Sequence, residues 1–419
     1  MARRFTVFVV VAMLLGILVG SLCHLELTDP AARATLSGDF GIVTDAFLRL
    51  IKMIIAPLVF ATLSVGIARM GDVGTLGRIA AKTMGWFVFA SLVSLTLGIV
   101  MVTVLEPGVS LALPIPPMDS TIGVKAASLT PKDFVAHLVP RSIAEAMANN
   151  EILQIVVFSG FFGVALAALG ERARRLVELT EQLAAVMLKI TGYVMLLAPL
   201  AVFAAIAATV TTQGLGILVT YGRFIGGFYL SLALLWMTLF ALGSLVLGTR
   251  ILKLVPMIRE PMILAFSTAS SEAAYPKTLE QLGRFGVSER ISSFVLPLGY
   301  SFNLDGSMMY CTFATLFIAQ AYGIHLTLGQ QVTMLLLLMV TSKGMAGVPR
   351  ASLVVIAATL AHFGIPEAGL LLILAVDQIL DMGRAATNVV GNSIATVVVA
   401  VWEDSLGAPA EPPLPAVGS

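Results

Sequence analysis

The sequence predicts an all-α polytopic membrane protein, with eight transmembrane helices and two re-entrant hairpins that enter the membrane from opposite faces. Of its 419 residues, 58% are hydrophobic and only 12% are charged, about half the charged share of a soluble protein. The mean hydropathy is +0.97, and several apolar runs have the roughly 20 residues that a membrane span needs. Two polar, Gly-, Ser- and Pro-containing interruptions lie in corresponding places of the second half, which indicates the hairpins.

The first 250 residues contain six ordinary spans. The positive-inside rule places the N-terminus, with Arg3 and Arg4, in the cytoplasm, and the next basic clusters alternate correctly. Segment 106–150 holds six prolines and mixed charge, so we predict an external loop. The first apolar run resembles a signal peptide, but no convincing cleavage site follows, and we interpret it as a retained span. The apolar runs are 5–23, 40–68, 84–105, 152–170, 185–210 and 222–249.

The second half of the chain has a different pattern. Segment 265–276 is too short and too polar to span, and basic residues flank it on both sides. Both of its ends are therefore expected in the cytoplasm, which predicts a re-entrant hairpin. The apolar run that follows, 291–321, is broken in its middle at 303–307.

A second hairpin is predicted from the run 331–364, which has its polar break at 342–350. No nearby basic residue draws its ends to the cytoplasm, so we expect it to enter from the outside. The last span, 369–402, returns the chain to the cytoplasm. This order is an inverted-topology repeat, and secondary transporters place their binding sites at such junctions. A kinked helix remains the alternative for each interruption taken alone.

Five polar side chains fall on one face of the last span. At 3.6 residues per turn they lie within an arc of about 80°. Each charge costs at least about 2.5–3.5 kcal/mol at the centre of a membrane helix, so it is expected to face protein or a water-filled cavity. We interpret the stripe as a substrate or ion site; buried ion pairs between helices are the alternative. The five residues are Asp377, Asp381, Arg384, Asn388 and Asn392.

The residue types favour a ligand with both an anionic and a cationic group. The planar guanidinium of Arg384 suits a carboxylate, and Asp381 could hold an ammonium group. Ser270 and Ser271, at the tip of the first hairpin, can present backbone N–H groups to an anion.

The broken helix offers ligands for a cation. Asn303 and Asp305 supply oxygen, which hard cations such as Na⁺ prefer, although Asp305 could instead cap the half-helix that follows. Glu272 and Arg350, one at each hairpin tip, either pair across the site and gate it or line the rim of a solvated cavity. Glu272 is also a candidate proton carrier.

Four motifs in this order closely resemble the dicarboxylate/amino acid:cation symporter family of glutamate and aspartate carriers. The resemblance covers nearly the whole chain and is strongest from about residue 260. The motifs are STASSEAAYP (267–276), SFNLDGS (301–307), SKGMAGVP (342–349) and DMGRAATNVVGN (381–392).

The resemblance implies a homotrimer in which a transport domain moves like an elevator against a scaffold. Residues 1–250 would form mainly scaffold and trimerisation helices, with the third and sixth spans joining the transport domain. Residues 251–404 would form the core transport domain, and 405–419 reads as a disordered Pro- and Ala-rich tail.

The resemblance also implies roles for individual residues. Arg384 would bind the side-chain carboxylate of the substrate, and Asp381 would bind its amino group. The expected substrate-binding residues are Ser270, Ser271, Ser307, Val348, Asp381, Arg384 and Asn388. The expected cation-binding residues are Ser91, Gly299, Ser301, Asn303, Asp305, Ser342, Met345, Asn388 and Asn392.

Some positions depart from the sodium-driven members of the family. Asn392 replaces a cation-binding Asp, and Phe87 and Ala90 replace a Tyr and a Thr, which leaves only Ser91 of that group. The lost charge and hydroxyls favour protons over Na⁺ as the coupling ion. Cys311 corresponds to the proton-carrying glutamate of animal members, so the proton carrier stays open between Asp381, Asp305 and Glu272.

The predicted function is symport of L-glutamate or L-aspartate with protons across the cell inner membrane. Symport of C4-dicarboxylates is the alternative, because Ala385 and Arg350 replace a Thr and a Gly of amino acid carriers. The expected partners are the acidic substrate, the lipid bilayer and two further copies of the chain; we expect no cofactor, no nucleic acid and no metal beyond Na⁺. An intramembrane enzyme using Asp377 and Asp381 is disfavoured by Arg384 beside them, and only flux measurements separate a transporter from a channel.

Overall fold

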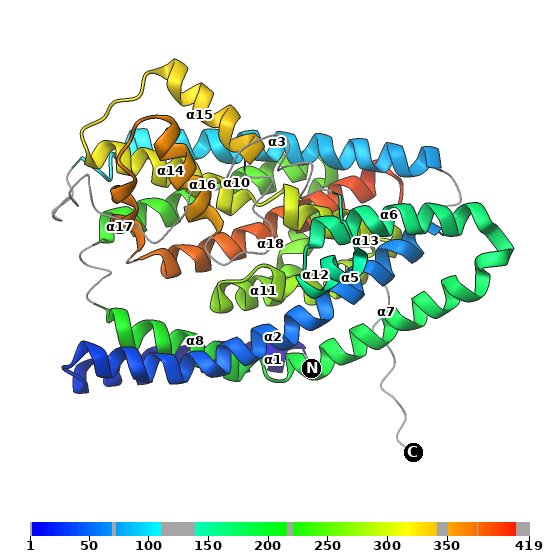
Figure 1. The fold of residues 1–419 in the computed structure, drawn as a ribbon, viewed down its shortest axis with the longest axis horizontal. Helices are drawn as coiled ribbons and strands as arrows, with labels where there is room; N and C mark the ends of the chain where they lie inside the picture. Colours follow the sequence, from blue (N-terminus) through cyan, green and yellow to red (C-terminus); the bar gives the residue numbers. More distant parts are fainter. Residues whose placement is uncertain are drawn as a thin grey trace.

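The structure, a computed structural model, describes residues 2–68, 73–109, 139–215, 221–341, 351–374 and 376–407 (Figure 1). This part of the chain is built from α-helices and short 3₁₀ turns, and its β pairing is limited to an isolated bridge between Val287 and Leu406. The prediction of an all-α chain is confirmed for these residues. By length and composition, four helical stretches within them can cross a membrane: Gly74–Leu105, Gln154–Val194, Gly222–Thr268 and Asp377–Trp402.

One layer of the fold is built around α2, and its helices α1 and α8 lie along one side of the molecule (Figure 1). Helices α1 and α2 pack along α8, and α2 also packs against α6 and α7. The close approach of α1 to α8 requires glycine, since a Cβ on Gly16 or Gly20 would lie 2.8 Å from a carbonyl oxygen of α8. The layer comprises α1 (Ala2–Glu26), α2 (Pro30–Ala68), α6 (Ile152–Leu169), α7 (Arg174–Met195) and α8 (Ala198–Gln213).

The expected span 185–210 is divided between two helices. Helix α7 ends at Met195, and α8 begins at Ala198 after a two-residue turn. A proline occupies the first turn of α8, where its missing N–H costs no helical hydrogen bond. The apolar composition of the run predicted a span but not this interruption.

The second layer surrounds α18, which runs through the middle of the molecule (Figure 1). Contacts to α18 come from α3, α10, α11, α13 and α14. In its most apolar stretch of 18 residues, 89% is buried. This burial explains how a helix with charged residues can sit inside an apolar protein. The elements are α3 (Val73–Leu105), α10 (Gly222–Leu247), α11 (Ile251–Thr268), α13 (Glu289–Phe302), α14 (Asp305–Ala321) and α18 (Asp377–Trp402); the short helix α5 (Ile143–Ala148) lies within the expected loop 106–150.

The first expected hairpin is a helix–turn–helix. Helix α11 is followed by a tight turn, a short 3₁₀ helix η3 (Glu272–Ala274) and α12 (Tyr275–Phe285), which packs back against α11. The turn begins at Ala269, whose φ of 50° ends α11 in the left-handed region.

The second expected hairpin has two helices, α15 (Leu328–Thr341) and α16 (Ala351–His362), which also pack against each other. Its tip, 342–350, lies outside the described residues.

The break predicted at 303–307 is confirmed. Helix α13 ends at Phe302 and α14 starts at Asp305, while Asn303 and Leu304 have non-helical backbone angles. The last run contains a second break, which we did not expect. Helix α17 (Leu370–Leu374) stops before α18, so Asp377 stands in the first turn of α18, where its negative charge complements the helix dipole.

The end of α18 is tied to the start of α3. The carboxylate of Glu403 pairs with Arg78 at 3.0 Å and with Lys82 at 2.7 Å, and its side chain is only 2% exposed. Residues 405–407 hydrogen-bond to the turn at 286–290. They are the first residues of the expected tail. The rest of the expected tail, 408–419, lies outside the described residues.

Candidate functional site

All five polar residues of the predicted stripe lie on α18. Four of the five are buried, and Asp381 is the exception, with 28% of its side chain exposed. The stripe is therefore closed on most of its length and open at one residue. The buried side chains belong to Asp377, Arg384, Asn388 and Asn392.

Arg384 is held by two carboxylates of its own helix. Its Nη2 atom lies 2.7 Å from Asp381 Oδ1 and 3.3 Å from Asp377 Oδ1. Its Nε and Nη1 atoms are buried and have no hydrogen-bond acceptor among the described residues. An unsatisfied buried donor costs about 1–3 kcal/mol, and more when it is charged. The guanidinium thus has donors available for an anionic ligand.

Tyr310 of α14, which was not among the expected site residues, contacts the same guanidinium. The ring centre lies 4.2 Å from the Arg384 Cζ atom, and the hydroxyl donates to Asp377 Oδ1 at 3.2 Å. The ring face and the hydroxyl therefore fix both Arg384 and its partner Asp377. No local pattern marks Tyr310, since α14 is apolar and almost wholly buried.

Asn388 joins α18 to the start of α14. Its Oδ1 atom accepts hydrogen bonds from the backbone N–H groups of Gly306 at 2.9 Å and Ser307 at 3.4 Å. Its Nδ2 atom donates to the Ser307 hydroxyl at 3.2 Å. Asn388 therefore supplies the N-terminal cap that no neighbouring side chain gives α14. The alternative in which Asp305 caps this half-helix stays a prediction.

A polar cluster surrounds Asp305 of α14. It includes Asn392 of α18, which lies about two turns after Arg384. Ser94 donates to Asp305 Oδ1 at 3.0 Å, and Asn303 Nδ2 donates to Asp305 Oδ2 at 3.0 Å. The same Asn303 amide donates to Asn392 Oδ1 at 3.2 Å. The structure thus brings together four buried side chains from α3, the helix break, α14 and α18.

Two atoms of this cluster, Asn303 Oδ1 and Asn392 Nδ2, are buried and have no hydrogen-bond partner among the described residues. The same holds for the buried Ser301 hydroxyl, two residues before Asn303 in the chain. Unpaired oxygens beside a carboxylate can take a cation or a proton. No group of three or more His, Cys, Asp or Glu that could hold a metal occurs in the described part of the chain.

Two glycines make room for the cluster. A Cβ on Gly299 would lie 2.3 Å from Asn392 Oδ1, and one on Gly391 would lie 1.9 Å from Asp305 Oδ2. Only glycine lets α13 and α18 approach these polar groups so closely. Gly299 therefore lies beside the cluster, and its carbonyl accepts the N–H of Asn303. The expected cation-binding roles of Gly299 and Ser301 stay predictions.

Ser94 and Ser91 are both buried serines of α3. The Ser94 hydroxyl donates to Asp305 Oδ1, and sequence reasoning did not single it out. The Ser91 hydroxyl donates to the Phe87 carbonyl at 2.5 Å, one turn back on its own helix, and its expected part in cation binding stays a prediction. Ser94 lies three residues further along on the same helical face, and the packing of α3 on α14 brings its hydroxyl to the carboxylate.

The tip of the first hairpin lies near the start of α18. The ring of Phe266 on α11 packs against Tyr229 of α10, whose hydroxyl donates to the Ile379 carbonyl of α18 at 2.6 Å. Among the described residues, Ser270 and Ser271 make no hydrogen bond to Asp381 or Arg384. The Ser270 hydroxyl instead accepts the N–H of Ala273 within the turn.

The remaining expected residues are placed as follows. Glu272 begins η3 at this tip and is half-buried. Cys311 is a buried free thiol on α14, one residue after Tyr310. Four residues expected at the second hairpin tip lie outside the described residues, namely Ser342, Met345, Val348 and Arg350.

Comparisons with known proteins agree on one family. The model of the sodium:dicarboxylate symporter family matches residues 5–402. The chain is 38% identical over 413 residues to a C4-dicarboxylate transport protein of Anaeromyxobacter sp. (strain K), covering 97% of this chain and 91% of that protein. It is 42% identical over 369 residues to a protein of the same name from Cupriavidus pinatubonensis, covering 86% and 85%. A proton/sodium-glutamate symport protein of Bacillus caldotenax is 37% identical over 400 residues, covering 94% and 93%.

Proposed function

The chain belongs to the sodium:dicarboxylate symporter family, and from this premise we propose that it imports L-glutamate or L-aspartate across the cell inner membrane together with protons. It is a symporter of that family and a multi-pass membrane protein. The substrate, the coupling ion and the membrane are the parts that we propose. The proposed activity is transport and involves no catalytic step.

One observation carries the choice of substrate, namely the partly exposed carboxylate of Asp381 at 2.7 Å from the buried guanidinium of Arg384. An acidic amino acid offers a carboxylate to the free donors of Arg384 and an ammonium group to Asp381. Arg384 and Asp381 then each meet an opposite charge, and the free donors of Arg384 gain an acceptor. A C4-dicarboxylate has no positive charge for Asp381, and one of its carboxylates would lie near a like charge.

Symport of C4-dicarboxylates remains a second candidate, because the relatives from Anaeromyxobacter and Cupriavidus carry that name. Ala385, next to Arg384, also lacks the hydroxyl that helps to bind an amine in amino acid carriers. L-Aspartate and succinate differ only in the amino group, so this matched pair of ligands can separate the two candidates.

The cluster around Asp305 supports proton coupling. Two neutral side chains, Ser94 and Asn303, donate hydrogen bonds to this buried carboxylate. A buried carboxylate in such surroundings is stabilised by taking up a proton or by binding a cation. Asn392 adds an amide to the cluster where a second carboxylate would favour Na⁺. We therefore propose Asp305 as the proton carrier ahead of Asp381 and Glu272.

We further propose a homotrimer in which the helices around α18 move as one transport domain. The dense contacts of α18 with α3, α10, α11, α13 and α14 support a single moving body. The tip residues Ser270, Ser271 and Val348 would close over the substrate, and Glu272 and Arg350 would gate the tips.

The test uses the purified full-length protein in liposomes, with labelled L-aspartate, L-glutamate and succinate and with an imposed gradient of either H⁺ or Na⁺. We expect L-aspartate or L-glutamate to accumulate with the proton gradient in the absence of Na⁺. Accumulation only with a Na⁺ gradient would contradict proton coupling, and uptake of succinate alone would contradict the substrate. Arg384→Ala should abolish uptake of every acidic substrate, and normal uptake by this variant would refute the site.

A further inference from the structure

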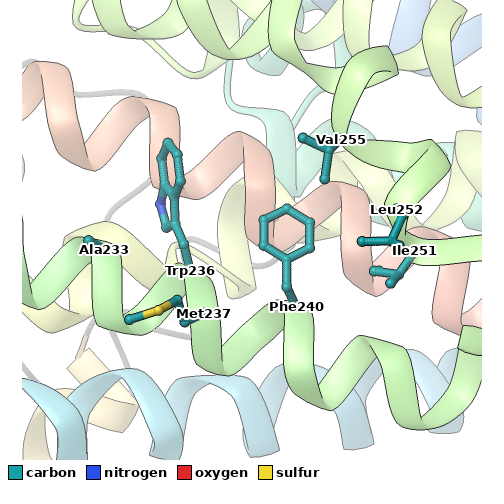
Figure 2. A pocket seen from close by; sticks show the side chains of 7 residues that line it. All are labelled: Ala233, Trp236, Met237, Phe240, Ile251, Leu252 and Val255. Atoms are coloured by element: carbon teal, nitrogen blue, oxygen red, sulfur yellow. The ribbon is translucent and has the colours of Figure 1, made fainter. Parts of the chain in front are cut away.

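An apolar groove lies between α10 and the first turns of α11. Its volume is about 480 Å³, within the range of ligand pockets. Figure 2 shows side chains of α10 on one side of the groove and side chains of α11 on the other. The lining residues are Ala233, Trp236, Met237, Phe240, Ile251, Leu252 and Val255.

The groove is elongated and open to the outside. The four lining residues of α10, Ala233 to Phe240, follow the spacing i, i+3, i+4 and i+7, so they form one face about 10 Å long. Met237 is 59% exposed and Leu252 is 71% exposed. In a multi-pass membrane protein, such exposed apolar side chains face the hydrocarbon of the bilayer.

The walls of the groove are held in place. The Trp236 Nε1 atom donates to Thr387 Oγ1 of α18 at 2.8 Å, so its polar edge is satisfied away from the groove. Near the end of α10, a Cβ on Gly243 would lie 3.0 Å from Ile394 Cγ2 and 3.1 Å from Ile251 Cδ1. This close approach joins α10 to α11 and α18 and closes that end of the groove.

Two cations stand at the end where α11 begins. Arg250 and Lys253 are exposed and flank the lining residues Ile251 and Leu252. Neither has an acidic side chain within 4 Å in the part of the chain that the structure describes. The positive-inside rule predicts that this end faces the cytoplasm, whose leaflet carries anionic lipids.

We propose that the groove binds one acyl chain of an anionic phospholipid and that Arg250 and Lys253 bind its headgroup. The apolar walls match a hydrocarbon chain, and the two free cations match a net negative headgroup at the adjacent membrane surface. Each cation near the surface favours an anionic lipid by about five-fold. We therefore expect a preference of about 25-fold for phosphatidylglycerol over phosphatidylcholine.

The binding test uses Trp236 as a probe. The chain has three tryptophans, and Trp86 and Trp402 pack against each other elsewhere, with ring centres 5.9 Å apart. In the variant Trp86→Phe/Trp402→Phe, only Trp236 fluoresces, and acyl chains brominated near the tail quench it on contact. Brominated phosphatidylglycerol should quench at a mole fraction many-fold lower than brominated phosphatidylcholine does.

Two double variants with the same loss of charge form the matched pair. Arg250→Gln/Lys253→Gln should abolish the preference, and Arg172→Gln/Arg175→Gln, at exposed positions before and within α7, should retain it. Ala233→Phe, which fills the groove, should weaken quenching by both lipids.

Equal quenching by the two lipids, or a preference that survives Arg250→Gln/Lys253→Gln, would overturn the proposal. Absence of quenching by either lipid would overturn it too, since a second protein copy would then cover the groove. Native mass spectrometry of the chain with all three tryptophans provides an independent readout. It should detect retained phosphatidylglycerol that is lost only when Arg250 and Lys253 are neutralised.

Discussion

Removal of the charge of Asp381 should separate the two substrate candidates. Asp381→Asn keeps the shape of the side chain and leaves Arg384 paired with Asp377 at 3.3 Å, so we expect the fold to survive. The loss should fall on ligands with an ammonium group. L-Aspartate and succinate differ only in that group, which makes succinate the internal control.

The expected size of the loss follows from the position of Asp381. An ammonium group about 4 Å from the carboxylate gains about 4 kcal/mol at an effective dielectric constant of 20. The side chain is 28% exposed, and Arg384 already shares its charge, so we halve this figure to about 2 kcal/mol. Affinity for L-aspartate should therefore fall about thirty-fold, while affinity for succinate should stay equal or rise.

The affinity for each ligand is measured by calorimetric titration of the purified protein, and its transport is measured by uptake in liposomes. Glu171→Gln serves as a matched control and should leave both affinities unchanged. It neutralises a carboxylate in the turn between α6 and α7, where the side chain is 92% exposed. Equal losses for L-aspartate and succinate would show that Asp381 supports the structure of the site and does not recognise an amine. A change below about three-fold for L-aspartate would refute the reasoning altogether.

Three further predictions concern the cluster and the end of α18. Asn392→Asp places a second carboxylate beside Asp305 and should make uptake respond to a Na⁺ gradient; an unchanged response would contradict the role assigned to the missing charge. Gly391→Ala puts a methyl group onto Asp305 Oδ2 and should cost about 1–3 kcal/mol of stability and most of the uptake, measured by thermal unfolding and flux, whereas wild-type behaviour would argue against this close approach. The hydrogen bond from Arg78, with a smaller contribution from Lys82, lowers the pKa of Glu403 below its usual 4.5, so its ion pairs stabilise the protein above that pH and are lost as the pH falls through the lowered pKa. Glu403→Gln should therefore lower stability by about 1 kcal/mol at pH 7, and the difference from wild type should shrink below about pH 4; a difference that does not vary with pH would exclude the ion pairs as its cause.

Local patterns predicted much of this site, because helical periodicity depends only on neighbouring residues. The spacing from Asp377 to Asn392 placed the five polar side chains on one face of one helix, as found. The Asn303–Ser307 motif marked the break between α13 and α14 for the same reason, since polar residues and glycine interrupt an apolar helix.

Contacts between distant segments could not be predicted in this way. They depend on how two helices are rotated and how closely they cross, which no single helix encodes. Ser94 reaches Asp305, 211 residues away, because α3 presents that face to α14. The cap that Asn388 provides for α14 and the ring of Tyr310 on Arg384 arise in the same way.

The sequence by itself determined the helical class, the charged stripe, the helix break and the family. Composition, period and motif suffice for these features, because each is a property of one continuous segment. Only the tertiary structure decided which atoms of the stripe are satisfied. It left Nε and Nη1 of Arg384 and Oδ1 of Asn303 buried without partners, since the helices that bury them come from distant parts of the chain and bring no acceptor or donor within reach among the described residues.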